Sequence, residues 1–288
     1  MNRCNFVSPR AMSEVLDILA ADPEAKLLAG GTDLIVQMRE GRVSPRTLVD
    51  LSRFGELSYI KLRHDTLHVG CMTTFNQVAR NPLVVRHAPA LAQAARQVGS
   101  VQIRNQGTIG GNLANASPAA DSIPPLIALG AKAQVVSRDG SRSLAIEDLL
   151  AGVGINTLLP GEMIAEINFS LPAPRARSAF VKLGRRKAMA IARISMAGLL
   201  VLSADGLVTE ARLALGAVGA TVFRALEAEA ALLHKPLDRA VVAACLQAVQ
   251  DTVAQKLGRR ASATYKREAI RGVAEELFFQ LVPELSAP

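Results

Sequence analysis

Cysteine is scarce in this chain of 288 residues, and the three cysteines present lie far apart. Cys4, Cys71 and Cys245 form no Cys-x-x-Cys pair, which argues against a metal site and against the disulfide framework of a small secreted domain. Three separated thiols fit a reducing compartment, so we expect a cytoplasmic protein that binds no metal. Histidine is scarce too, and we expect the four scattered histidines on the surface or at helix caps. These are His64, His68, His87 and His234.

Aromatic residues make up only 3% of the chain, and tryptophan is absent. Because 50% of the residues are hydrophobic, we expect a sizeable core built mostly from aliphatic side chains and alanine. No apolar run is long enough to span a bilayer, and the first residues carry no apolar segment of the signal-peptide kind. We therefore expect a soluble protein without a membrane span.

Acidic residues are outnumbered by basic ones, 25 to 33, which gives a formal net charge of +8. A basic surface suits nucleic acid, an acidic partner or an anionic cofactor. The basic runs, Gly184-Arg-Arg-Lys187 and Arg259-Arg260, are short and are not interleaved with aromatics, so we expect no nucleic-acid binding. No Ser-His-Asp set and no pair of carboxylates stands out for acid–base work, and we expect no catalytic side chain in this chain.

What the sequence does have is two segments rich in glycine and small polar residues. The first glycine segment, residues 29–34, reads Ala-Gly-Gly-Thr-Asp-Leu. The second glycine segment, residues 108–121, reads Thr-Ile-Gly-Gly-Asn-Leu-Ala-Asn-Ala-Ser-Pro-Ala-Ala-Asp. Glycine pairs let a backbone approach a ligand closely, and short Asn, Ser and Asp side chains offer directed hydrogen bonds. Two such segments suggest one extended polar ligand held at two places, although each alone reads equally well as a turn or a helix start.

The first glycine segment follows a short apolar stretch, residues 26–29, and precedes a helical pattern that reaches about residue 40. Thr32 and Asp33 are candidate N-caps of that helix. A strand, a glycine turn and a helix N-terminus form an anion site, because unpaired N–H groups and the helix dipole point at the ligand. The segment matches neither GxGxxG nor GxxxxGKS/T, so neither a Rossmann site nor a P-loop is predicted. Its alternative is an ordinary β–α turn.

Hydrophobic periodicity predicts an α+β fold in three parts. Residues 1–55 are expected to form a small α/β unit, residues 56–173 a larger mixed α+β unit, and residues 174–288 a C-terminal domain. Helices are expected over 12–21, 32–40, 74–80, 89–98, 122–129, 221–233, 238–257 and 263–281. Strands are expected over 26–29, 47–51, 59–63, 66–71, 133–137, 143–146, 163–171, 179–183, 194–203 and 207–215. The last three strands form a three-stranded antiparallel sheet, on which the last three helices pack as a small bundle.

Together, the two glycine segments resemble the FAD-binding (medium) subunit of the molybdenum hydroxylases, the family of xanthine dehydrogenase and aerobic carbon monoxide dehydrogenase. The resemblance runs through nearly the whole chain, in order and with suitable spacing. It implies an oxidoreductase subunit with a two-part FAD-binding region of the PCMH type, in which the flavin supplies the redox chemistry. It also implies noncovalent FAD, because we find no His or Cys beside the glycine segments that suits covalent attachment.

The resemblance implies a cofactor-binding set. The first glycine segment would hold the FAD pyrophosphate, and the second would lie against the ribityl and phosphate portions. Asp121 matches an aspartate that contacts FAD in relatives, and its alternative role is to cap the helix expected from residue 122. The set comprises Ala29, Gly30, Gly31, Thr32, Asp33, Leu34, Val98, Thr108, Ile109, Gly110, Gly111, Asn112, Asn115, Ser117, Asp121, Ile164, Ala165, Lys182 and Arg193.

The segment from Lys182 to Arg193 resembles the part of the family that approaches the isoalloxazine ring. Carbon monoxide dehydrogenase medium subunits place a tyrosine near that ring, whereas this chain has Ala190 at the nearest matching position. Arg193 stands where xanthine dehydrogenases have a flavin-site lysine, so a cation near the ring and a solvated charge at a strand edge are both open. Thr32-Asp33 leans slightly toward the xanthine dehydrogenase type.

By resemblance, a large molybdopterin-binding subunit oxidises the substrate, a small subunit carries 2Fe-2S clusters, and the assembly is a dimer of heterotrimers. This chain would pass electrons from the clusters to NAD or a quinone-like acceptor. The substrate would be a purine, an N-heteroaromatic, an aldehyde or carbon monoxide. The alternatives are a non-catalytic scaffold with an empty flavin site, which intact glycine segments disfavour, and a stand-alone flavoprotein oxidase, for which we find no acid or base.

Overall fold

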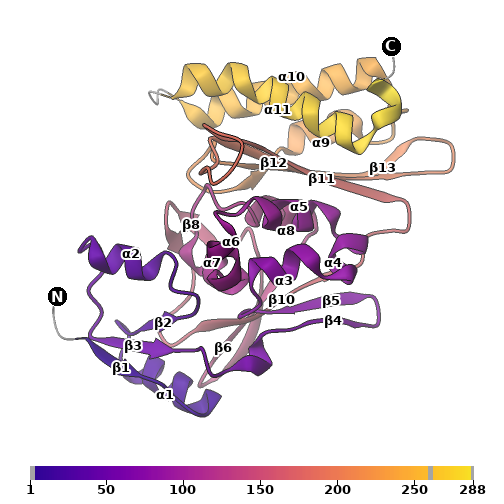
Figure 1. Ribbon diagram of the computed structural model, residues 1–288. Helices are drawn as coiled ribbons and strands as arrows, with labels where there is room; N and C mark the ends of the chain where they lie inside the picture. The colour runs from indigo at the N-terminus through magenta and orange to yellow at the C-terminus, as the bar shows by residue number, and fades with distance from the viewer. Residues whose placement is uncertain (1–3, 259–261, 287–288) are drawn as a thin grey trace.

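Three larger β-sheets follow one another along the chain, with helices packed on them (Figure 1). The computed structural model describes residues 4–258 and 262–286. A three-stranded parallel sheet comes first, a five-stranded antiparallel sheet second and a four-stranded antiparallel sheet last. This arrangement agrees with the predicted α+β fold.

The N-terminal sheet has the strand order β1-β3-β2, with both pairs parallel. Its elements are β1 (Asn5–Val7), α1 (Met12–Ala21), β2 (Lys26–Leu28), α2 (Leu34–Arg39) and β3 (Thr47–Asp50). Val15 and Leu19, one turn apart on α1, are buried in the same core as Val49 of β3. Because β2 ends at Leu28, this sheet presents the first glycine segment at its carboxyl edge.

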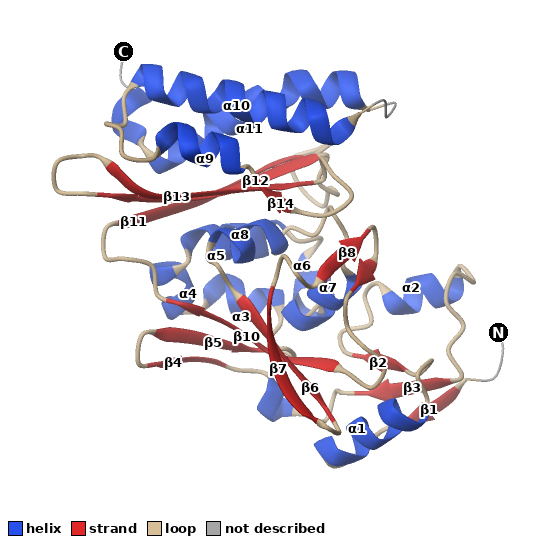
Figure 2. Ribbon diagram, turned by 180° about the vertical axis from the view of Figure 1, so that it is seen from behind, coloured by secondary structure: helices blue, strands red, loops and turns tan. Residues whose placement is uncertain are grey.

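The central sheet has the strand order β4-β5-β10-β6-β7. Its strands are β4 (Ile60–Arg63), β5 (Thr66–Gly70), β6 (Lys132–Ser137), β7 (Gly140–Ala145) and β10 (Met163–Ser170), and a small hairpin of β8 (Leu150–Gly152) and β9 (Ile155–Asn156) lies apart from it. Its helices are η1 (Gly55–Leu57), α3 (Phe75–Arg80), α4 (Pro82–His87), α5 (Pro89–Gln97), α6 (Val101–Gln106), α7 (Ile109–Asn115) and α8 (Ile123–Ala128). Leu67, Val69 and Ile167 are fully buried in one core with residues of these helices, so the helices cover one face of the sheet (Figure 2).

The C-terminal sheet has the strand order β11-β12-β13-β14. Its elements are β11 (Ala176–Leu183), β12 (Ile194–Leu202), β13 (Val208–Gly216), β14 (Phe223–Arg224), α9 (Leu226–Leu232), α10 (Arg239–Leu257), α11 (Ala263–Leu281) and η2 (Pro283–Ser286). Ile194 and Met196 of β12 join the core under α10 and α11, whereas Ala197 and Leu199 join the core of the central part. Figure 2 shows this sheet between α9–α11 above it and α5 and α8 below it.

Several expectations about elements need correction. The C-terminal sheet has a fourth, two-residue strand, β14, where a helix over 221–233 was predicted, and the helix itself begins only at Leu226. The start of the second glycine segment is the first turn of helix α7, which agrees with a helix start and not with a turn. Strand β1, helices α4 and α6, and the β8–β9 hairpin were not predicted. All are six residues long or shorter, so their hydrophobic patterns are too brief to recognise.

The prediction that every histidine is a surface or capping residue is wrong for His68. Its Nδ1 lies 2.8 Å from Oε1 of Glu166, and only 19% of its side chain is exposed. Tyr59 donates its hydroxyl to the other Glu166 oxygen at 2.6 Å, and burial together with this carboxylate raises the pKa of Tyr59. Within residues 4–258 and 262–286 we find no group of three or more His, Cys, Asp or Glu placed to hold a metal ion. In the same part of the chain, no helix has the length and apolarity needed to cross a membrane.

Candidate functional site

The two glycine segments, far apart in sequence, meet backbone to backbone. A Cβ added to Gly30 would lie 1.9 Å from the carbonyl oxygen of Gln106 and 3.0 Å from Cα of Gly107, just before the second segment. A Cβ added to Gly111 would lie 3.9 Å from Cβ of Ala29. Only a residue without a side chain permits the first of these contacts. The structure therefore brings together the two segments that the sequence singled out.

The first glycine segment turns from β2 into α2. Gly31 has φ of +68°, which favours glycine, and its carbonyl accepts the first α-helical hydrogen bond, from Ile35 N at 3.1 Å. Asp33 occupies the N-cap position, but its side chain makes no capping hydrogen bond and is exposed, while Thr32 is half-buried. Leu34 is the first helical residue. Of the two predicted N-cap candidates, Asp33 therefore holds the N-cap position and Thr32 does not, and the Asp33 side chain, which makes no capping hydrogen bond, remains available to a ligand.

The second glycine segment opens helix α7, and its first N–H groups are already used by the protein. Thr108 caps the helix, since its Oγ1 accepts from Gly111 N at 3.2 Å. Ile109 N donates to the carbonyl of Thr73 and Gly110 N to that of Cys71, both at 2.9 Å. This helix start therefore has no spare N–H among these three with which to hold an anion.

Gly110 is a packing residue. A Cβ at this position would lie 2.5 Å from Cβ of Cys71. Cys71 therefore lies beside the second glycine segment. Its thiol is buried and burial raises its pKa to about 12, so it is a protonated, inert group and not a point of covalent attachment.

The small polar residues after the glycines hold the segments to their surroundings. Asn112 accepts from the hydroxyl of Ser122 at 2.7 Å through its side-chain oxygen. Asn115 accepts from the Gln37 amide at 3.2 Å, which ties α7 to α2 of the N-terminal part. Ser117 accepts from Ala119 N at 3.3 Å in a local turn. These side chains shape the site, and their direct contact with a ligand stays a prediction.

Asp121, at the end of the second glycine segment, forms a buried ion pair with Lys182 of β11. Lys182 Nζ lies 2.5 Å from Oδ2 of Asp121, and it also donates to the carbonyl of Gln97 at 3.1 Å. The two side chains are 7% and 6% exposed. The helix-capping alternative for Asp121 is wrong, because its carboxylate turns to Lys182 and Ser122 occupies the N-cap of α8.

The other carboxylate oxygen of Asp121 lacks a partner. Oδ1 is buried, and within the described residues nothing donates a hydrogen bond to it. Burial raises the pKa of Asp121 to about 6, although Lys182 opposes the shift. An ionised carboxylate only accepts hydrogen bonds, so a ligand with an N–H or O–H donor fits this oxygen. FAD, with its ribityl hydroxyls and ring N–H, carries such donors.

The ring-side segment, residues 182–193, was predicted to approach the flavin ring. It forms a loop whose two ends, Leu183 and Arg193, are joined by a backbone hydrogen bond. Arg193 N donates to the carbonyl of Leu183 at 2.8 Å, and Ile191 in between is 82% exposed. The guanidinium of Arg193 lies 5.9 Å from the ring centroid of Tyr265, so this cation is stacked on an aromatic ring and is not simply solvated. Ala190 contacts Gly184 closely enough that a Cβ on the glycine would lie 2.7 Å away.

Of three other members of the predicted set, Ile164 is buried, and Val98 and Ala165 are half-buried and accept hydrogen bonds through their carbonyls. Val98 ends α5, and its carbonyl accepts from Arg104 at 3.0 Å. Ile164 is 5% exposed within the core, so any contact it makes with a ligand runs through its main chain. Ala165 lies at a bulge of β10, and its carbonyl accepts from Cys71 N at 3.0 Å.

Three residues at this site were not predicted from the sequence: Gln37, Gln97 and Ser195. Gln37 and Gln97 act through bonds to Asn115 and Lys182 that join segments 78 and 85 residues apart. Ser195 is fully buried on β12 with a hydroxyl that has no partner among the described residues. A polar residue within the apolar run of β12 is the one sequence signal that would have drawn attention to it.

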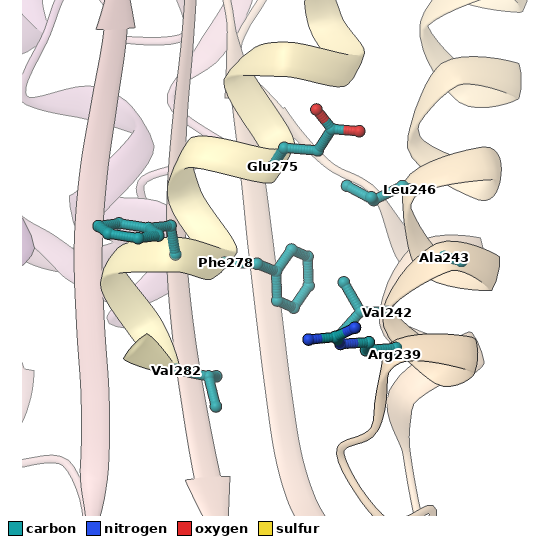
Figure 3. Close-up of a pocket in the computed structure, with 8 residues that line it drawn as sticks. Arg239, Val242, Ala243, Leu246, Glu275, Phe278 and Val282 are labelled. Carbon is teal, nitrogen blue, oxygen red and sulfur yellow. The ribbon is translucent and has the colours of Figure 1, made fainter. Parts of the chain in front are cut away.

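A separate apolar cavity of about 230 Å³ lies between α10 and α11 (Figure 3). Val242 and Leu246 of α10 face Phe278 and Val282 of α11 across it. These helices cover the opposite face of the C-terminal sheet from α5 and α8, so the cavity is not part of the site around the glycine segments.

Comparison with known proteins agrees with this geometry. Residues 2–174 match the family described as the FAD binding domain in molybdopterin dehydrogenase. Residues 179–281 match the CO dehydrogenase flavoprotein C-terminal domain. The chain belongs to the FAD-binding subunits of the molybdenum hydroxylases. The family resemblance predicted from the two glycine segments is therefore confirmed, and the chain is an oxidoreductase subunit with an FAD-binding domain.

Individual relatives of this FAD-binding subunit cover almost its whole length. The nicotinate dehydrogenase FAD-subunit of Eubacterium barkeri is 33% identical over 99% of this chain and 98% of its own. The xanthine dehydrogenase FAD-binding subunit of Escherichia coli O157:H7 is 33% identical over 94% and 93%. Among solved structures, carbon monoxide dehydrogenase of Hydrogenophaga pseudoflava has a TM-score of 0.91 at 29% identity, covering 97% of both chains. Quinoline 2-oxidoreductase of Pseudomonas putida 86 has a TM-score of 0.90 at 27% identity, covering 99% of both.

Proposed function

We propose that this subunit binds FAD noncovalently across its two glycine segments and relays electrons from an iron–sulfur partner to NAD or a quinone-like acceptor. The observation that carries the proposal is the backbone contact between the segments at Gly30 and Gln106. A ligand that lies on one segment is therefore within reach of the other. A single extended cofactor fits this arrangement better than two separate small ligands.

The two segments contribute different groups to the cofactor. The start of α2, with the half-buried Thr32 and the exposed Asp33, supplies N–H groups that a helix leaves unpaired, and these suit the pyrophosphate. The first N–H groups of the second segment are already bonded within the protein, so they are not available to the cofactor. This segment instead lets the cofactor come close to the backbone at the exposed Gly111.

The buried end of the site carries the charges. Asp121 accepts a hydrogen bond from the cofactor at Oδ1. Lys182 pairs with the other carboxylate oxygen and so joins β11 to the end of the second glycine segment. Bound FAD supplies the electron transfer, and the side chains of this chain bind and orient it. Arg193, stacked on Tyr265, places a positive charge at the C-terminal end of the ring-side segment.

The rest of the proposal concerns the assembly. A large molybdopterin-binding subunit would oxidise a purine, N-heteroaromatic, aldehyde or carbon monoxide, and a small 2Fe-2S subunit would deliver its electrons in a dimer of heterotrimers. We also propose the division of the chain at residues 55/56 and 173/174, and a cytoplasmic location. The relatives named above as subunits support the assembly, and the three separated thiols support the location.

The visible absorption spectrum of the purified chain, taken before and after acid precipitation, tests this function. We expect flavin bands that move into the supernatant, because the FAD is held by noncovalent contacts. Colour that stays with the pellet would mean covalent attachment, as in a stand-alone oxidase. A chain without flavin that also fails to bind added FAD would contradict the proposal.

A further inference from the structure

Two buried side-chain atoms have no hydrogen-bond partner in the part of the chain that the structure describes: Oδ1 of Asp121 and Oγ of Ser195. Asp121 is 6% exposed, and Ser195 is fully buried. Buried polar atoms in folded proteins nearly always have a partner. Two exceptions in one protein therefore point to a group that the chain itself does not supply.

Both atoms lie at one seam, which we define as the contact between residues 117–124 and the ends of strands β11, β12 and β13. Ser195 is the antiparallel register partner of Lys182. Directly opposed residues carry their side chains on the same face of a sheet, so Ser195 and Lys182 are neighbours on one face, with the Ser195 hydroxyl turned toward Gly216 of β13. The Lys182 side chain ends on Asp121. The two residues with unpartnered atoms, Asp121 and Ser195, are therefore both neighbours of Lys182.

The other side of Ser195 fixes its position against the seam. Its register partner on β13 is Gly216, and a Cβ there would lie 2.4 Å from Ser195 Oγ. The same Cβ would lie 3.1 Å from Cγ of Pro124 and 3.3 Å from the carbonyl oxygen of Pro118. Ala217 N donates to that carbonyl at 2.7 Å. Ser195 thus faces the segment that carries Asp121.

Packing does not explain the serine. The next residues on the same face of β12 are Ala197 and Leu199, which are buried in the apolar core of the central part. An alanine at position 195 would continue that surface and would leave no hydroxyl unsatisfied. The hydroxyl at this one place is therefore best explained by a polar group that reaches it in the loaded protein.

We propose that Ser195 is a further cofactor-contacting residue, whose hydroxyl and Asp121 Oδ1 together receive the hydrogen-bonding edge of FAD. This inference rests on the proposed function. The two atoms select complementary groups: the carboxylate oxygen takes an N–H or O–H donor, and the hydroxyl both donates and accepts. A ribityl hydroxyl and the N–H and C=O edge of the flavin ring both meet this requirement.

Ser195→Ala separates a cofactor contact from a structural role. In the variant, the cofactor loses one hydrogen bond, so the Kd for FAD should rise roughly threefold to tenfold, measured by fluorescence titration of the FAD-free chain. The melting temperature of the FAD-free chain should stay unchanged or rise, because an unsatisfied buried hydroxyl is removed. The increase in melting temperature that FAD produces should shrink.

Ser178→Ala is the matched control. Ser178 lies on the same sheet, in β11, but its hydroxyl already accepts from Ala90 N at 3.3 Å. This variant should lower the melting temperature with and without FAD and leave the Kd for FAD unchanged. A shift of the visible flavin bands in Ser195→Ala would assign the contact to the ring, and an unshifted spectrum with weaker binding would assign it to the ribityl chain.

An FAD affinity of Ser195→Ala within twofold of the wild-type value would overturn the inference, as would an equal fall in melting temperature with and without FAD. Wild-type protein that binds no FAD would instead overturn the proposed function. The two failures are therefore distinguishable in the same titration.

Discussion

In the first glycine segment, both glycines are required by backbone geometry: Gly30 faces the carbonyl of Gln106 at a distance that no side chain tolerates, and Gly31 has a positive φ. In the second segment, the two glycines differ. Gly110 is pressed against Cys71, whereas Gly111 is exposed and meets only the hydroxyl of Thr108 at 3.0 Å and Ala29. In the first segment the Gly-Gly pair thus lets the two segments meet. In the second segment Gly110 serves packing, and Gly111 leaves its backbone open to approach.

The aspartates that follow the glycines differ as well. Asp33, two residues after Gly31, is exposed, whereas Asp121, ten residues after Gly111, is buried and paired with Lys182. The first segment therefore resembles a solvent-facing anion cradle, and the second leads into a closed, charged interior. In the proposed complex, the helix dipole of α2 would therefore stabilise the phosphate end of the cofactor, and the buried Asp121–Lys182 pair would bind its ring end.

Gly30→Ala should have the largest effect, because it separates the two segments. The new Cβ would lie 1.9 Å from a main-chain oxygen, which cannot rotate away as a side chain does. We expect unfolding stability to fall by about 1–3 kcal/mol and FAD to be lost, as measured by urea denaturation and flavin content. Gly55→Ala is the control, since nothing lies within 4 Å of a Cβ there. Retention of FAD by Gly30→Ala would mean that the cofactor does not bridge the segments.

The pair Gly110→Ala and Gly111→Ala sharpens the contrast within the second segment. Gly110→Ala should lower the free energy of unfolding by about 1–3 kcal/mol, because its Cβ would overlap Cys71. Gly111→Ala should change it by less than about 1 kcal/mol, since the helix propensity of alanine offsets crowding against Thr108. For the cofactor we expect the opposite order within this pair: Gly111→Ala should weaken FAD binding although it stays folded, whereas the folded fraction of Gly110→Ala should bind FAD like the wild type.

Gly272→Ala controls for helix propensity in this comparison. It replaces another helical glycine, in α11, with nothing within 4 Å of the added Cβ. It should be as stable as Gly111→Ala or more so, and should bind FAD like the wild type. Equal FAD binding by Gly111→Ala and Gly272→Ala would show that the exposed face of Gly111 does not approach the cofactor.

The sequence predicted well what depends on local pattern. Helices α10 and α11 were expected over 238–257 and 263–281 and run from Arg239 to Leu257 and from Ala263 to Leu281, because their apolar residues recur over many turns. The strands of the C-terminal sheet were likewise placed to within three residues, apart from the two-residue β14. Both glycine segments were recognised from residue types alone.

What the sequence could not predict depends on contacts between distant segments. Nothing near Asp121 indicates Lys182 as its partner, 61 residues away, and nothing near Gly110 indicates that Cys71 determines its role. The helix cap, given from local sequence as the alternative role of Asp121 because Asp often caps helices, is wrong because burial beside a lysine stabilises a different geometry. For the same reason Ser195 carried no local signal beyond its apolar neighbours.

The pH dependence of FAD binding tests the role of Asp121, and we expect this effect to be the smallest. Burial raises the pKa of Asp121 to about 6 from an unfolded value of 3.8, so the folded chain binds the proton more tightly. The stability contributed by this group is fully present below about pH 4 and is lost as the pH rises through about 6. A cofactor donor at Oδ1 favours the ionised carboxylate and lowers its pKa, so FAD affinity should rise over the same interval.

We expect the Kd for FAD of the wild-type chain to fall roughly fivefold between pH 5 and pH 7, for a cofactor that lowers this pKa by about one unit. Asp121→Asn should remove that dependence, because the amide does not titrate, whereas Asp33→Asn should retain it, because Asp33 is exposed and lies in the segment that we propose for the phosphate end. Fluorescence titrations of the three proteins across this pH range measure the difference. A pH dependence that persists in Asp121→Asn would mean that another group titrates. The buried Asp121–Lys182 pair would then not distinguish the second segment from the first in cofactor binding.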